Sequence, residues 1–144
     1  MAEILFLEDE VTIREVITEY MNVAGHKVTE CGNGDEAVER LKERKFDLAV
    51  LDIRVPGISG LKVLEYIRTE LKSDMGVIML TAYEDINTQV EAFNFFADDY
   101  ITKPASPIIL LKRIEVLLRR ISDDVKMKDS SLVIDDKAYR AYYE

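Results

Sequence analysis

Short continuous apolar runs alternate along the chain with longer segments whose apolar residues recur at helical spacing. The runs at 4–7 (Ile-Leu-Phe-Leu) and 47–52 (Asp-Leu-Ala-Val-Leu-Asp) are typical of strands buried on both faces of a sheet. The segments between the runs carry one apolar stripe each, as in residues 107–121, where Leu110, Ile114 and Leu117 share a face. Because strands that alternate with helices form parallel sheets, the pattern predicts an α/β fold with helices on both faces.

Five strands and five helices are predicted. The strands are 4–7, 27–31, 47–52, 77–80 and 99–102, and the helices are 10–24, 35–44, 61–71, 86–95 and 107–121. These elements make up one domain, residues 1–121. Residues 122–131 are polar and aperiodic, which predicts a linker. Residues 132–144 combine an apolar triplet, two acids and three tyrosines, and we expect them to begin a second domain that the chain contains only in part.

Composition narrows the class of protein. The 144 residues are close to the usual size of one domain, and 28 acidic against 19 basic residues give a net charge of −9. That charge argues against a chain covered by nucleic acid, which would need a basic face. The single cysteine, Cys31, has no intramolecular disulfide partner and favours a reducing compartment. No apolar run approaches the ~20 residues of a membrane span, and the start does not resemble a signal peptide, so we expect a cytoplasmic protein.

Polar side chains gather where the predicted strands end. Glu8, Asp9 and Glu10 follow the first strand, Asp52 ends the third, Thr81 and Ala82 follow the fourth, and Lys103 and Pro104 follow the fifth. Ligands of open α/β sheets bind beyond the carboxyl ends of the strands, so we expect these groups to converge. Three neighbouring carboxylates need a cation to stay ionised. Oxygen ligands of this kind suit Mg²⁺, and the sequence has no cluster of His and Cys for zinc or iron.

Each of these residues also has a purely structural interpretation. An acid such as Asp9 or a hydroxyl such as Thr81 caps the following helix in many proteins, Asp52 can belong to a turn, and Lys103 can be an ordinary surface lysine. The functional interpretation is favoured because all four are expected at the same edge of the sheet.

The motifs at these strand ends resemble those of the receiver domains of two-component response regulators. The matching segments, in chain order, are 4–10 (Ile-Leu-Phe-Leu-Glu-Asp-Glu), 51–60 (Leu-Asp-Ile-Arg-Val-Pro-Gly-Ile-Ser-Gly), 80–82 (Leu-Thr-Ala), 97–100 (Ala-Asp-Asp-Tyr) and 102–104 (Thr-Lys-Pro). The resemblance covers residues 3–121 and is greatest to the subfamily whose output is a winged-helix DNA-binding domain, to the start of which residues 132–144 are similar. It implies the flavodoxin-like doubly wound sheet, with strand order 2-1-3-4-5.

The resemblance also implies a role for each residue of the site. Asp52 would accept a phosphoryl group from a sensor histidine kinase. Asp9, Asp52, Glu8 through water and the Arg54 carbonyl would hold Mg²⁺. The residues implied to contact the phosphoryl group or to switch with it are Thr81, Ala82, Tyr100 and Lys103, and the Lys103–Pro104 peptide would be cis. The protein would therefore be a signalling switch rather than an enzyme acting on other substrates.

The subfamily implies a homodimer formed on phosphorylation, and DNA contact only through the output domain. One ion pair typical of its dimers has neither partner here, because Gln89 and Ile109 stand at those positions. Phe96 replaces the usual glycine, either as an additional core aromatic or as an apolar patch on the dimer face. The residues expected on that face are Gln89, Phe96, Asp98, Asp99, Ile109, Arg113, Val116 and Arg120.

Three other functions are weighed against this one. A metal-dependent phosphatase of the aspartate-nucleophile type needs an acid–base aspartate two residues after the nucleophile, where this chain has Arg54. A flavin or dinucleotide binder needs a glycine-rich or hydroxyl-rich turn after the first strand, where Glu8, Asp9 and Glu10 would repel phosphate. A receiver that acts as an interaction module without phosphorylation is the remaining alternative.

Overall fold

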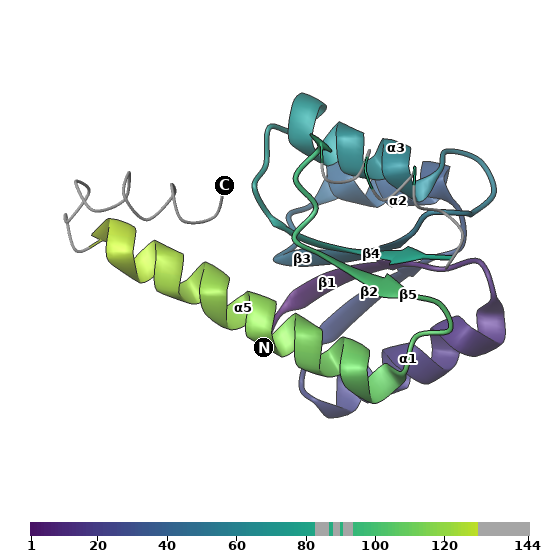
Figure 1. The fold of residues 1–144 in the computed structure, drawn as a ribbon, viewed down its shortest axis with the longest axis horizontal. Helices are drawn as coiled ribbons and strands as arrows, with labels where there is room; N and C mark the ends of the chain where they lie inside the picture. Colours follow the sequence, from purple (N-terminus) through teal and green to yellow (C-terminus); the bar gives the residue numbers. More distant parts are fainter. Residues whose placement is uncertain (83–86, 88–89, 91–93, 130–144) are drawn as a thin grey trace.

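The computed structural model describes residues 1–82, 87, 90 and 94–129, and its centre is a five-stranded parallel sheet (Figure 1). The strands lie in the order β2-β1-β3-β4-β5, which confirms the predicted topology. Their bounds are β1 (Glu3–Leu7), β2 (Lys27–Cys31), β3 (Leu48–Asp52), β4 (Gly76–Thr81) and β5 (Asp99–Thr102). The central strand β3 is buried along its whole length, as its apolar run predicts.

Helices cover both faces of the sheet. Helices α1 (Val11–Val23) and α5 (Pro107–Asp129) lie on one face, and α2 (Gly34–Glu43) and α3 (Gly60–Glu65) lie on the other (Figure 1). Asn33 caps α2 by accepting a hydrogen bond from the Glu36 N–H (2.8 Å), and Ser59 caps α3 in the same way. The predicted helix 86–95 falls largely outside the described residues, so four of the five predicted helices are observed.

Two apolar layers form the core because successive side chains of a strand point to opposite faces. Leu5, Leu7 and Leu51 pack with α2 and α3. Ile4 and Phe6 pack with α1 and α5, where the predicted stripe of α5 is buried. The sheet is thus held between two pairs of helices.

Two helices differ from the prediction. The third helix changes at Tyr66 into a wider π-helical turn, η1 (Tyr66–Glu70), in which the Leu71 N–H donates to the Tyr66 carbonyl (3.0 Å). Helix α5 continues to Asp129, beyond its predicted end at residue 121, so the predicted linker is helical as far as Asp129. The segment 122–129 contains no glycine or proline to stop the helix. The predicted second domain, 132–144, lies outside the described residues.

None of the helices in the described part of the chain is long and apolar enough to cross a membrane.

Candidate functional site

Backbone hydrogen bonds between neighbouring strands bring the predicted site residues to one edge of the sheet. The Glu8 N–H donates to the Cys31 carbonyl (3.0 Å), and the Ile53 N–H to the Leu80 carbonyl (3.1 Å). The Lys103 N–H donates to the Thr81 carbonyl (2.8 Å). The parallel register thus continues one residue beyond the strands, so residues far apart in the sequence lie side by side, as expected.

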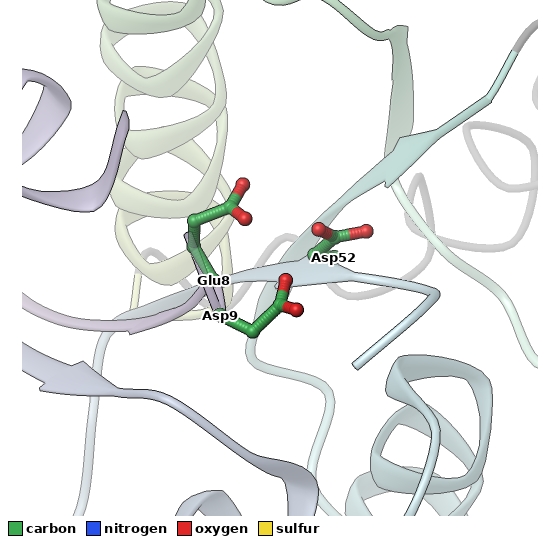
Figure 2. A group of neighbouring side chains, drawn as sticks. All are labelled: Glu8, Asp9 and Asp52. Carbon is green, nitrogen blue, oxygen red and sulfur yellow. The ribbon is translucent and has the colours of Figure 1, made fainter. Parts of the chain in front are cut away.

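Three carboxylates face one another at this edge (Figure 2). Glu8 is fully buried and Asp52 is 2% exposed, whereas Asp9 lies at the surface. One oxygen from each lies within 4.8 Å of the others. The predicted acidic cluster is therefore present, with one member accessible to solvent.

Lys103 supplies a positive charge to the cluster. Its Nζ lies 2.7 Å from Asp52 Oδ2 and 3.3 Å from Glu8 Oε1. Burial by itself would lower the pKa of Lys103, but the hydrogen bond with Asp52 and the charges of Asp52 and Glu8 outweigh it and raise that pKa. Lys103 therefore stays an ammonium at neutral pH. The Lys103–Pro104 peptide is cis, as predicted.

One ammonium does not fully compensate three carboxylates. Burial raises the pKa of Glu8, and the charge of Asp52 raises it further, while the Glu10 N–H and Lys103 act in the opposite direction. Glu8 Oε1 is buried and has no hydrogen bond of good geometry, despite its ionic contact with Lys103. A buried carboxylate oxygen that lacks a well-formed hydrogen bond, beside two further carboxylates, fits a divalent cation with oxygen ligands such as Mg²⁺.

The remaining predicted site residues surround Asp52. The Arg54 N–H donates to Asp52 Oδ1 (3.2 Å). A cavity of about 210 Å³ lies in front of the carboxylate, and Asp9, Arg54, Ala82 and Lys103 line it. This cavity gives a small ligand access to an aspartate that is otherwise buried.

Thr81 and Tyr100 lie on the two neighbouring strands. Thr81 is 1% exposed at the end of β4, and its hydroxyl donates to the Ala82 carbonyl (3.3 Å). Tyr100 on β5 packs against the core, and burial raises its pKa to about 12. Tyr100 is thus a neutral phenol at physiological pH.

Two residues that position the site escaped the sequence analysis. Arg14 on α1 donates to the Glu8 carbonyl (2.8 Å) and pairs with Glu30 (3.3 Å), which fixes the backbone of the acidic segment. A Cβ at Gly60 would lie 2.0 Å from the Asp52 carbonyl oxygen, so α3 begins close to Asp52 only because residue 60 is glycine. No spacing rule finds Arg14, whereas Gly60 belongs to the recognised segment 51–60.

The structure describes most of the residues predicted for the dimer face. Phe96 is 74% exposed with a backbone φ of +60°, so the interpretation of Phe96 as a core residue is wrong. Ile109 and Val116 are exposed on α5. Arg113 pairs with Asp99 (2.9 Å) within the chain. Arg120 is also exposed, and Gln89 lies outside the described residues.

Asp98, also predicted for this face, is bound within its own chain. Its Oδ2 accepts hydrogen bonds from the Val77 N–H (2.8 Å) and from Arg68 Nη2 (3.3 Å). Arg68 also donates to the Phe95 and Phe96 carbonyls. Through these hydrogen bonds Asp98 links the start of β5 to the start of β4, independently of any contact it makes across the proposed dimer interface.

Comparison with known proteins agrees with this geometry. Residues 4–115 match the family model of the response regulator receiver domain. Response regulator RR06 of Streptococcus pneumoniae is 38% identical over 98% of this chain and 64% of its own length. The phosphate regulon transcriptional regulatory protein PhoB of Pseudomonas aeruginosa is 36% identical over 95% of this chain and 62% of its own. This chain thus spans less than two thirds of either relative.

Solved structures share the fold. A response regulator receiver domain protein from Methanospirillum hungatei superposes with a TM-score of 0.81 at 28% identity, over 86% of this chain and 98% of the other. The beryllofluoride-activated DrrB receiver domain gives a TM-score of 0.74 at 31% identity, over 83% and 98%.

Proposed function

This chain belongs to the family of response regulator receiver domains, and we propose that Asp52 is its phosphoacceptor, modified by a sensor histidine kinase. The observation that carries the proposal is the setting of the Asp52 carboxylate. It opens onto a cavity of about 210 Å³, 2.7 Å from the Lys103 ammonium and beside the carboxylates of Glu8 and Asp9. A receiver domain is a signalling switch, so we expect the phosphoryl group to be transferred to one of its own side chains rather than to a separate substrate.

The proposed step exchanges one bond to phosphorus for another. An Asp52 oxygen forms a P–O bond while the P–N bond of the kinase phosphohistidine breaks and its electron pair returns to the imidazole. Lys103 compensates the charge that accumulates on the phosphoryl oxygens, and the Arg54 N–H holds Asp52 Oδ1 in place. Asp9, Asp52, the Arg54 carbonyl and, through water, Glu8 would hold Mg²⁺, which would supply the remaining positive charge.

We propose that Thr81, Ala82 and Tyr100 transmit the modification. Phosphorylation brings the charge at Asp52 toward −2 and adds oxygens that accept hydrogen bonds. The Thr81 hydroxyl, which donates to the adjacent Ala82 carbonyl at 3.3 Å, then turns to a phosphoryl oxygen. The neutral Tyr100 side chain moves inward behind it, which alters the surface of β5 and α5.

The output of the switch is proposed to be transcription. Both curated relatives named above are response regulators, and PhoB is by name a transcriptional regulatory protein. We propose that residues beyond α5 lead into a DNA-binding domain that begins at 132–144, and that DNA is contacted only there. We also propose a cytoplasmic location, because a receiver of this kind would meet its sensor kinase there.

We further propose that phosphorylation produces a homodimer whose face includes Phe96, Ile109 and Val116, with Gln89, Asp98, Asp99, Arg113 and Arg120 around them. The three apolar residues are exposed, at 74%, 53% and 41%. Because burial of apolar surface stabilises such a contact without ion pairs, the dimer should persist at salt concentrations that screen surface charges within ~8–10 Å.

Sedimentation of the beryllofluoride-activated protein tests this. Ile109→Glu should dissociate the dimer, and Lys27→Glu, at an exposed lysine on the edge strand β2 opposite β5, should not. Dissociation by moderate salt alone would count against the proposal.

Phosphorylation itself is tested by incubation with acetyl phosphate and Mg²⁺, followed by intact-mass measurement. We expect the parent protein to gain one phosphoryl group and Asp52→Asn to gain none. Asp9→Asn should be labelled more slowly because it loses a metal ligand, and Asp74→Asn, an exposed carboxylate elsewhere, should behave like the parent. Equal labelling of Asp52→Asn would refute the assignment. A parent protein that is never labelled would instead be an interaction module.

A further inference from the structure

A second cavity lies far from Asp52. It has a volume of about 600 Å³ and opens between the C-terminal ends of α2 and η1. This is the end of the molecule where the strands begin, at the left in Figure 1. A five-residue strand is ~16 Å long, so the cavity and the phosphoacceptor lie at opposite edges of the sheet.

Basic side chains line this cavity in a chain that is strongly acidic. Lys42, Arg44, Lys45 and Lys72 border it, with Glu43 as the single acid, and Glu43 is already paired with Arg40 (3.1 Å). The whole chain has nine more acidic than basic residues. The local charge is therefore opposite in sign to the charge of the protein.

The attraction of basic side chains to the C-terminal end of α2 explains only some of the positive charge around the cavity. Lys42 lies in the last turn of α2, where a cation complements the helix dipole, and it contacts Glu39 (3.7 Å). Lys45 and Lys72 have no local partner, because neither side chain makes a hydrogen bond or ion pair with any residue the structure describes. Lys72 also has a left-handed backbone φ of +51°, where glycine would be less strained.

The floor of the cavity is apolar. Leu71 is 37% exposed there, and Met75 and Phe46 lie beside it. The Arg44 guanidinium stands 5.3 Å from the Phe46 ring centroid, so one face of that ring is covered and is not available for stacking with a nucleobase. A cationic rim around an apolar floor is complementary to a peptide that carries carboxylates beside an apolar anchor.

We propose that this groove, which we call the α2–η1 groove, binds an acidic segment of a partner protein. An apolar side chain of the segment packs against Leu71 and Met75, and carboxylates on either side of it face Lys45 and Lys72. None of the residues that line the groove lines the Asp52 cavity or belongs to the proposed dimer face. The groove gives the protein a second partner that does not depend on the phosphoryl group.

A labelled peptide tests the proposal directly. The probe is a fluorescein-labelled peptide in which a Leu-Phe pair is flanked by three acidic residues on each side, titrated with the full chain and followed by anisotropy. We expect saturable binding that weakens about tenfold when two serines replace the pair and disappears when lysines replace the acids. The double variant Lys45→Glu/Lys72→Glu should lose about tenfold in affinity, and Lys45→Gln/Lys72→Gln about threefold.

Two control variants separate this proposal from the others. Lys112→Glu, at a lysine on α5 whose side chain is 75% exposed, should change the affinity less than twofold. Asp52→Asn should bind the peptide like the parent, so failure of the phosphoacceptor assignment leaves this result unaffected. The proposal is overturned if binding is not saturable, if the serine peptide binds equally well, or if Lys112→Glu is equally harmful. It is also overturned if a DNA duplex displaces the peptide and depends on Lys45 and Lys72, which would assign the groove to nucleic acid.

Discussion

Replacement of Arg68 by alanine should cost more stability than any other single change on the surface that joins η1 to β4 and β5. The Arg68 side chain is 11% exposed, and all five of its N–H groups are used. Nε donates to Phe95, Nη1 to Ser73 and Met75, and Nη2 to Phe96 and Asp98, over distances of 2.8–3.3 Å. Four carbonyls and a carboxylate therefore depend on one guanidinium.

The expected loss follows from these contacts. Each hydrogen bond contributes about 1 kcal/mol net, but the carbonyls at the rim regain water when the side chain is removed. Counting about three effective bonds gives a loss of about 3 kcal/mol, a large fraction of the 5–15 kcal/mol typical of a domain. Arg68→Lys should lose about half as much, because an ammonium keeps the charge opposite Asp98 but has three donors and no planar fork.

Urea unfolding followed by far-ultraviolet circular dichroism measures the loss, since the chain has no tryptophan. Lys62→Ala is the matched control. It lies on α3, its side chain is 68% exposed, and its ion pair with Glu65 is a surface pair, so a change below about 0.5 kcal/mol is expected. A loss below about 1 kcal/mol for Arg68→Ala would show that these hydrogen bonds do not stabilise the domain, and the reasoning would fail.

Three further substitutions test other parts of the account. Burial raises the pKa of Glu8, so the neutral carboxyl favours the folded state and stability is lost as pH rises above the ordinary glutamate value of about 4.3. Glu8→Gln should therefore flatten the pH dependence of the unfolding free energy between acid and neutral pH without Mg²⁺; an unchanged profile would contradict the electrostatics. Phe96→Gly should stabilise the domain by about 0.5–1 kcal/mol in thermal unfolding, because it relieves a positive φ at a side chain that buries little surface; a loss would show that the aromatic ring contributes to packing. Gly60→Ala should lower both the melting temperature and the rate of labelling by acetyl phosphate, because its Cβ would meet the Asp52 carbonyl at 2.0 Å; normal values for both would mean that the start of α3 shifts without consequence.

The alternation of apolar runs and helical stripes was sufficient to predict the sheet. The strand β3 is recognisable because every one of its residues is buried, and the strand ends then locate Glu8, Asp52 and Lys103 at one edge. The parallel register then brings these side chains together, because it aligns the carboxyl ends of strands that are distant in the sequence.

The features that escaped prediction depend on contacts between distant residues. Arg68 binds groups 27–30 residues further along the chain, and no periodicity encodes those partners. Arg14 likewise joins the Glu8 carbonyl to Glu30, which lies 16 residues further along the chain. The end of α5 is hard to predict for a different reason: an apolar stripe shows only which residues face the sheet, and the helix continues past the stripe where no glycine or proline stops it.

The measurement that tests the central claim most directly is a map of the modified residue. After reaction with acetyl phosphate and Mg²⁺, borohydride reduces the acyl phosphate to an alcohol, and peptide mass spectrometry then locates the reduced side chain. We predict that the reduced residue is Asp52 and that Glu8 and Asp9 remain intact. Reduction at Glu8, Asp9 or any other carboxylate, with Asp52 unmodified, would contradict the assignment of Asp52 as the phosphoacceptor.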